Sequence, residues 1–192
     1  QDWIHSVDPV FNVVGRVCFH LAENKANATA PFAFLATFAT RVSDRAKVQH
    51  LPLSQALRAY AGDRAQLLTL LVPVQMAAEA SAFVKKIVDS GEIFHPLAWT
   101  PEEAFQFLRD VAAFESACVV VRVPDWWKAR RPARPQVRVT IGNAPSRGLG
   151  VGALLDFSVR LTLDGEPLSD AEISELLAAH SGLALLKGRW IE

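Results

Sequence analysis

The sequence predicts an α+β fold, with a helix-rich first part that holds a buried strand and a smaller antiparallel-sheet part with one helix. Apolar residues recur at helical spacing in several segments before residue 123. After residue 136, apolar and polar residues alternate at period two, which is typical of antiparallel strands with one buried face. The elements follow in a mixed order rather than as regularly alternating strands and helices, and this order favours the α+β class.

Composition excludes several kinds of protein. Hydrophobic residues make up 51% and charged residues 21% of the 192 residues, so the chain is globular rather than disordered. Twenty Lys and Arg balance twenty Asp and Glu, which argues against coating of nucleic acid through bulk charge. No signal peptide and no apolar run of the ~18 residues that span a bilayer are recognisable. We therefore expect a cytoplasmic segment of a longer chain, with no membrane partner.

The first segment with helical spacing begins at Asp8-Pro9, because Asp caps a helix and Pro suits its first turn. The apolar residues that would form one face of this helix are Val10, Val14, Val17, Cys18 and Leu21. Residues 24–30 are predicted to be a polar loop. Residues 32–38 then alternate with apolar side chains on both faces, which predicts a central strand.

Two helices are predicted over residues 53–72. The first ends near Gly62, and Asp63 starts the second. The side chains of the second helix that are expected to face inward are Leu67, Leu68, Leu71 and Val72. Pro73 is expected to kink or restart the helix, because proline lacks the amide donor and clashes with the preceding turn. The helix then continues over residues 76–88.

Thr100-Pro101-Glu102-Glu103 is a capping box, a sequence that starts a helix by satisfying its first amides. The apolar side chains of this helix are Phe107, Leu108, Val111 and Phe114. Residues 118–123 are rich in β-branched side chains and predict a buried strand. Cys18 and Cys118 each lie in an apolar stretch, so both are expected to be buried free thiols.

Residues 124–135 form a basic connection between a first part, 1–123, and a second part, 136–192. Three prolines within this connection argue against a helix or a central strand there. The two parts either fold separately or share one core.

Alternation in the second part predicts strands over residues 136–141 and 155–163. In the longer strand, the side chains expected to be buried are Leu155, Phe157, Val159, Leu161 and Leu163. Those expected to be exposed are Asp156, Ser158, Arg160 and Thr162. A second capping box at Ser169 to Glu172 starts a helix, and short strands follow at residues 183–186 and 190–191.

The most unusual chemistry lies in residues 124–138, where five basic residues stand against a single acid, Asp125. Aromatic rings stack on bases and arginine pairs with phosphate, so this loop is a candidate contact for nucleic acid or a partner. The candidate residues are Trp126, Trp127, Lys128, Arg130, Arg131 and Arg134. The alternative is a solvated basic linker whose Trp rings are anchored in the core.

No catalytic, cofactor-binding or metal-binding residue is predicted. The glycine-rich run at residues 148–152 lacks the Lys-Ser/Thr that completes a phosphate-binding loop. The five histidines are scattered without a paired ligand motif. We therefore expect no enzyme activity, no bound ATP and no metal in this chain.

Several unusual strings nevertheless point to one family. They are Phe19-His20-Leu21-Ala22-Glu23-Asn24-Lys25, Ala30-Pro31-Phe32-Ala33-Phe34-Leu35-Ala36-Thr37, Asp89-Ser90-Gly91-Glu92-Ile93-Phe94-His95-Pro96-Leu97-Ala98-Trp99, Val123-Pro124-Asp125-Trp126-Trp127 and Gly188-Arg189-Trp190. Together they resemble the accessory region ahead of the motor in bacterial Swi/Snf-family helicase-like ATPases. The resemblance extends from about residue 10 to the end of the chain.

The resemblance implies a parent protein that is a DNA-dependent ATP hydrolase, either a translocase or a helicase. In that family two RecA-like lobes hydrolyse ATP, so ATP and magnesium are expected only in the motor. No catalytic residue of the family maps onto this chain. The implied role is a non-catalytic, helicase-associated domain that docks on the motor of the same polypeptide or on another protein. The alternative role is a DNA-contacting module that uses the basic Trp-Trp loop.

Overall fold

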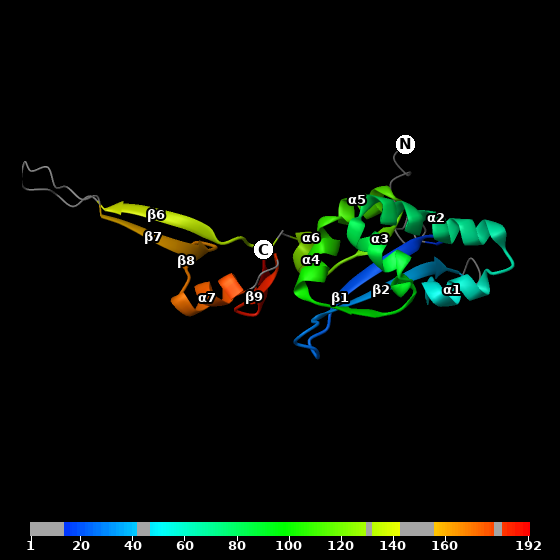
Figure 1. Cartoon of the computed structure of the whole chain (residues 1–192), viewed down its shortest axis with the longest axis horizontal. Helices are drawn as coiled ribbons and strands as arrows, with labels where there is room; N and C mark the ends of the chain where they lie inside the picture. The colour runs from blue at the N-terminus through cyan, green and yellow to red at the C-terminus, as the bar shows by residue number, and fades with distance from the viewer. Residues whose placement is uncertain (1–13, 42–46, 130–131, 143–155, 179–181) are drawn as a thin grey trace, which may run out of the picture. The chain divides into compact units, whose positions relative to one another are not determined.

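The computed structural model of the chain describes residues 14–41, 47–129, 132–142, 156–178 and 182–192 (Figure 1). The chain divides into two compact units, Gln1–Asp125 and Trp126–Glu192, hereafter unit 1 and unit 2. Each unit combines helices and strands, which confirms the predicted α+β class. Among the described residues, no helix combines the length and the apolar content needed to cross a membrane.

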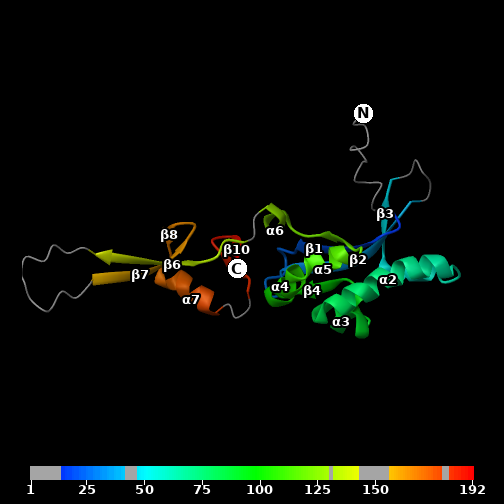
Figure 2. The same ribbon diagram turned by 90° about the horizontal axis from the view of Figure 1, so that it is seen from above.

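The described part of unit 1 is built on a five-stranded sheet. Its strands are β1 (Val17–Glu23), β2 (Phe32–Thr40), β3 (Gln49–Pro52), β4 (Leu97–Trp99) and β5 (Val120–Arg122). The strand order is β3-β2-β1-β5, and β4 also pairs with β2. Strand β2 is antiparallel to its neighbours, whereas β1 and β5 are parallel. Figure 2 shows β1 and β2 side by side. The prediction of a central apolar strand at β2 is confirmed.

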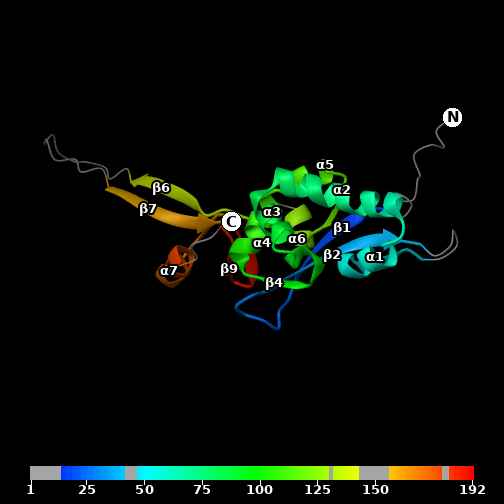
Figure 3. The ribbon, with the colours of Figure 1, turned by 45° about the vertical axis from the view of Figure 1, so that its right-hand side comes forward.

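Helices cover one face of this sheet. They are α1 (Leu53–Ala59), α2 (Arg64–Ala80), α3 (Ala82–Asp89), the 3-10 turn η1 (Glu92–Phe94), α4 (Pro101–Arg109) and α5 (Val111–Ser116). Figure 3 shows α2, α3 and α5 together on one side of β1 and β2. Buried aromatic rings join the two layers, because Phe19 of β1 lies 5.6 Å from Phe34 of β2 and 5.8 Å from Phe114 of α5, measured between ring centroids.

The helix predicted from Asp8-Pro9 is wrong in its described portion, because Val17–Glu23 form strand β1. Val17, Phe19 and Leu21 are buried at period two, a pattern that overlaps with helical spacing over so short a segment. Seven residues of β1 pair with β2, and this tertiary pairing selects the strand. Residues 1–13, including Asp8-Pro9, lie outside the described residues.

Helix α2 begins where predicted but buries a different face. The Asp63 carboxylate accepts hydrogen bonds from the amides of Ala65 and Gln66 at 3.0 and 3.1 Å. The residues that face the core are Leu70, Val74, Ala77 and Ala78, whereas the predicted inward residues Leu68, Leu71 and Val72 are exposed. The apolar side chains of α2 are distributed around all sides of the helix, so their spacing in the sequence does not identify the buried face. Pro73 lies inside α2 without a restart, and the break falls at Ser81 instead.

The capping box before α4 is confirmed. Thr100 Oγ1 accepts a hydrogen bond from the Glu103 amide at 3.3 Å, and the Glu103 carboxylate accepts one from the Thr100 amide at 2.8 Å. The single predicted helix is two helices, because α4 ends and α5 begins at Asp110. Phe107, Leu108 and Phe114 are buried as predicted.

The two cysteines differ. Cys18 is fully buried as predicted, but Cys118 is exposed, so the prediction of a buried thiol at Cys118 is wrong. Cys118 lies in the turn between α5 and β5 with a left-handed backbone, at φ 63°. Its amide donates to the Glu115 carbonyl at 3.0 Å. The turn therefore places this residue outside the strand, which starts only at Val120.

The basic connection contains a helix, contrary to the prediction. Helix α6 (Asp125–Ala129) fits between Pro124 and Pro132. The prolines flank the helix rather than interrupt it, and proline is disruptive mainly in a helix interior.

Besides most of α6, the described residues of unit 2 hold two small sheets and the helix α7. The elements are β6 (Gln136–Gly142), β7 (Asp156–Leu163), β8 (Glu166–Pro167), α7 (Asp170–Ala178), β9 (Ala184–Leu186) and β10 (Arg189–Ile191). The predicted strands and helix of this part are confirmed. Leu168, Leu186 and Ile191 form the core, and Leu161, Leu163, Ile173, Leu176 and Ala184 pack against it.

Burial along β7 differs from the prediction. Thr162, expected to be exposed, is 5% exposed, and its hydroxyl donates to the Gln136 carbonyl at 3.3 Å. Val159, expected to be buried, is 65% exposed. The core contacts Leu161 and Leu163 but does not extend to Val159. The alternation of apolar and polar residues therefore predicts the strand, but not which of its apolar side chains other residues cover. The side chains of residues 155–158 lie outside the described part.

The second capping box, before α7, is also confirmed. The Glu172 carboxylate accepts a hydrogen bond from the Ser169 amide at 2.7 Å and pairs with Lys187 Nζ at 2.9 Å. These contacts, the backbone hydrogen bond first, lower the pKa of Glu172 from 4.5 to about 2. Glu172 therefore stays ionised down to strongly acidic pH and ties α7 to the turn between β9 and β10.

Candidate functional site

The predicted aromatic contact residues lie at the start of unit 2. Trp126 and Trp127 stand on α6 and are both half-buried. The Trp126 ring stacks on Trp190 of β10, with centroids 6.3 Å apart and planes inclined by 29°. Trp127 meets Trp126 edge to face at 6.1 Å. The Trp126 ring thus packs against a neighbouring ring within unit 2, and such aromatic pairs contribute to the stability of a fold.

The basic side chains near these rings are only partly described. Arg134 forms an ion pair with Glu192 inside unit 2. The side chain of Lys128 and the whole of Arg130 and Arg131 lie outside the described part of the structure. The role of the six residues as a nucleic-acid or partner contact therefore stays a prediction.

An exposed apolar surface lies on the hairpin of β6 and β7. Val139 faces Val159 across the hairpin, and Val137 faces Leu161. Directly paired residues of antiparallel strands share one face. Val137, Val139 and Val159 are 64%, 55% and 65% exposed, and we call these three residues the hairpin face. The sequence predicts the strands and their apolar side, but does not reveal that this side is uncovered.

A groove of about 280 Å³ borders the hairpin face. Leu161 connects the two, because it lines the groove and pairs with Val137 of the hairpin face. The other apolar side chains of the groove include Ile173, Leu176, Leu177 and Ile191. Together the groove and the hairpin face form one apolar area on unit 2, and such areas mark interaction sites in soluble proteins.

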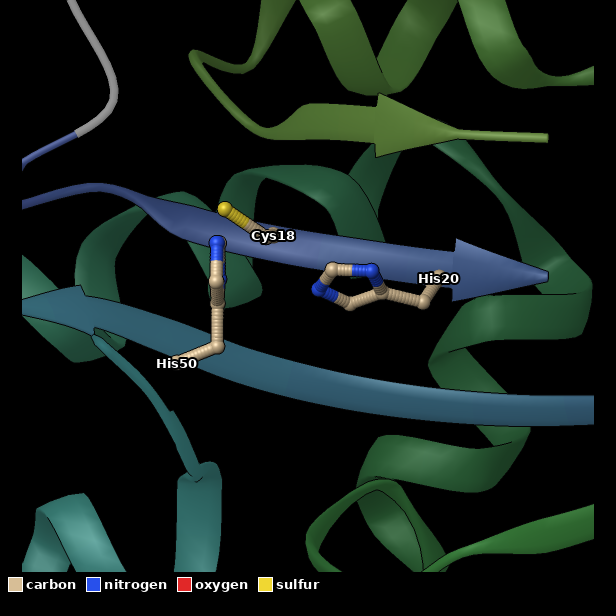
Figure 4. A group of neighbouring side chains, drawn as sticks. All are labelled: Cys18, His20 and His50. Carbon is tan, nitrogen blue, oxygen red and sulfur yellow. The ribbon is translucent and has the colours of Figure 1, made fainter. Parts of the chain in front are cut away.

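Unit 1 contains a cluster of potential metal ligands, Cys18 and His20 on β1 and His50 on β3. One ligand atom from each of the three side chains lies within 4.8 Å of the others. Cys18 is buried, and the two imidazoles are half-buried. Figure 4 shows the three side chains gathered on one face of the sheet, with helices on the other side.

The Thr37 hydroxyl of β2 connects the two histidines of this cluster. Thr37 Oγ1 lies 2.8 Å from His20 Nε2 and 3.3 Å from His50 Nδ1. Burial, followed by the charges of His50 and Arg122, lowers the pKa of His20 to about 4. Burial and Arg122 also lower the pKa of His50, whereas burial raises the pKa of the Cys18 thiol. Both imidazoles are therefore mainly neutral at pH 7, and each then has one unprotonated ring nitrogen.

Sequence reasoning missed this cluster for a physical reason. Cys18 and His20 share a face only in a strand, and the segment is predicted to be a helix. His50 follows His20 by 30 positions in the sequence. The pairing of β3 with β2, in which His50 lies opposite Ala39, brings it close to His20. The available signal was Cys18-x-His20 within an alternating run, which is weak without the strand assignment.

Comparison with known proteins identifies relatives among helicases. A family model described as SNF2 helicase protein matches residues 92–192. A protein of Bacillus subtilis (strain 168) named "Putative ATP-dependent helicase/translocase YwqA" is 32% identical over 95 residues, which span 47% of this chain and 10% of that protein. No solved structure matches significantly. These findings confirm the resemblance to Swi/Snf helicases, and because the family match covers just over half of the 192 residues, the chain belongs to the family of SNF2 helicase proteins.

Proposed function

We propose that this chain is a non-catalytic accessory domain of a bacterial Swi/Snf-type ATP-dependent DNA translocase or helicase. Its role is to dock on the motor domain of the same polypeptide. The exposed hairpin face of unit 2 carries this proposal, because it offers three neighbouring valines with no cover from the described residues. Membership of the SNF2 helicase protein family, whose match includes all of unit 2, supports it.

The motor domain is a more favourable occupant than a free partner. Burying a valine side chain contributes ~1.5–3 kcal/mol before the entropy of association is subtracted. A surface this small therefore binds weakly between separate molecules. Within one polypeptide the effective concentration reaches the millimolar range, so weak apolar contacts suffice. The relative named helicase/translocase is much longer than the aligned segment, which is 10% of its length.

In this proposal the motor supplies the chemistry. ATP and magnesium bind there, and the accessory domain holds neither. The sequence lacks the glycine-rich loop followed by Lys-Ser/Thr that cradles phosphates. A cytoplasmic location belongs to the same proposal, since bacterial DNA is cytoplasmic.

The test is hydrogen exchange on the full-length protein that carries this chain. Val139→Asp with Val159→Asp should speed exchange of the β6–β7 amides at least tenfold, because a charged face no longer docks. The matched control is Arg138→Gln with Arg160→Gln, which changes net charge equally on the opposite face of the same strands. This control should leave exchange unchanged.

The other outcomes identify other occupants. Protection that depends on protein concentration would indicate a second copy of the chain. Equal exchange in the wild type and both double variants would show that the hairpin face does not dock on the motor.

The alternative function is DNA contact through the basic Trp-Trp loop. Arg130 and Arg131 test it, because Arg134 already pairs with Glu192. If both arginines touch phosphate, Arg130→Ala with Arg131→Ala lowers the salt slope of DNA binding by about one unit per residue. The matched control removes two exposed charges from unit 1, with Arg58→Ala and Arg109→Ala. We expect indistinguishable titrations for all three proteins, and a reduced slope in the first variant alone would favour DNA contact.

A further inference from the structure

We propose that Cys18, His20 and His50 form a zinc-binding site on the sheet of unit 1, with a fourth position open to water or another ligand. The inference is independent of the docking proposal, which concerns unit 2. The sequence contains no paired ligand motif for this site, which is formed by side chains from two strands, β1 and β3.

The sheet of unit 1 brings the three side chains together. Cys18 and His20 are alternate residues of β1 and therefore point to one face, and the register places Thr37 opposite Cys18. Thr37 in turn contacts the imidazoles of His20 and His50, which places His50 beside His20. The three ligand atoms lie within 4.8 Å of one another. Tetrahedral zinc, with bonds of about 2.0–2.3 Å, needs donors roughly 3.3–3.7 Å apart. Binding of zinc therefore requires the donor atoms to approach one another by about an ångström.

The set of donor atoms is typical of a zinc site. One sulfur and two imidazole nitrogens are the ligands that zinc prefers, whereas magnesium and calcium take oxygen.

A neighbouring side chain orients the two histidines. Metal-binding histidines are usually oriented by a hydrogen bond to a neighbouring group. Thr37 is such a group, because it is almost fully buried and contacts a nitrogen of each ring. A bound zinc ion would take the place of the Thr37 hydroxyl at one of the two rings, His20 or His50, and the Thr37 hydroxyl would then orient the other ring. Thr37 is thus a positioning residue for the site.

The experiment titrates the chain with Co²⁺, whose thiolate charge-transfer absorption reports sulfur ligation, and then with Zn²⁺ in competition. We expect one equivalent of Co²⁺ to bind with a thiolate band that Zn²⁺ abolishes. His50→Gln should weaken binding at least tenfold, and Cys18→Ser should remove the band. Thr37→Val should weaken binding roughly 10–100-fold. Circular dichroism of each variant without metal shows whether it folds.

Two residues outside the cluster provide matched controls. Cys118→Ser and His95→Ala change an exposed thiol and an exposed imidazole of unit 1. Both variants should bind like the wild type. Absence of a thiolate band in the wild type would overturn the proposal. The proposal would also be overturned if Cys118→Ser reduced the affinity for metal while His50→Gln, folded as judged by circular dichroism, left it unchanged. If Cys18→Ser does not fold, His50→Gln decides.

Discussion

Phe107→Ala is expected to lower the free energy of unfolding of unit 1 by about 3–5 kcal/mol. The Phe107 ring is fully buried and joins four other rings. Its centroid lies 5.0 Å from Phe114, 5.4 Å from Phe34 and from Trp99, and 6.2 Å from Phe19. Removing it leaves a cavity between the sheet and helices α4 and α5, and rings held on several sides cannot collapse into that space.

The measurement is native-state hydrogen exchange of the β1 and β2 amides, which reports unit 1 separately from unit 2. Leu68→Ala is the control, because this apolar side chain also belongs to unit 1 but is exposed on α2. Its change should stay within about 0.5 kcal/mol. A loss below about 1 kcal/mol for Phe107→Ala would show that the aromatic cluster is not the main core of unit 1.

Leu186→Asp is expected to unfold unit 2, at a cost above about 4 kcal/mol, because it buries an unpaired carboxylate. Leu186 is 2% exposed and belongs to the small core formed with Leu168 and Ile191. So small a core offers few other contacts to offset the loss. No basic side chain belongs to this described core cluster, so the new carboxylate gains no partner there.

The neighbouring residue is a close control. Leu185 lies on the other face of β9 and is 57% exposed. Leu185→Asp should cost about 1 kcal/mol or less, which is the span of strand propensities. Hydrogen exchange of α7 and β9–β10 distinguishes the two variants. Similar exchange in both would mean that Leu186 is not part of the stabilising core.

Local signals predicted the starts of helices well. Asp63, Thr100 and Ser169 each cap a helix as expected, because a cap is a contact between residues two or three positions apart. The strand β2 was equally predictable, since its apolar alternation extends over both faces. In contrast, residues 17–21 satisfy both the helical and the strand period, and pairing with β2 decides between them.

Candidate sites were harder to predict than elements. The Trp-Trp loop was visible as composition, but the stacking of Trp126 on Trp190 joins residues 64 positions apart. The zinc-ligand cluster joins β1 and β3 through the register of β2. Neither contact leaves a mark at fixed sequence spacing, because sheet registers and ring stacking depend on how the chain folds back on itself.

The sequence by itself determined the α+β class, the capped helix starts, the central strand and the resemblance to Swi/Snf helicases. Each depends on residue identity at short range or on whole strings of residues. Only the tertiary structure decided that β1 is a strand, that Cys118 is exposed and that Val159 is uncovered while Thr162 is buried. The physical reason is that periodicity marks a side chain as apolar or polar, whereas burial requires a second element to lie against it.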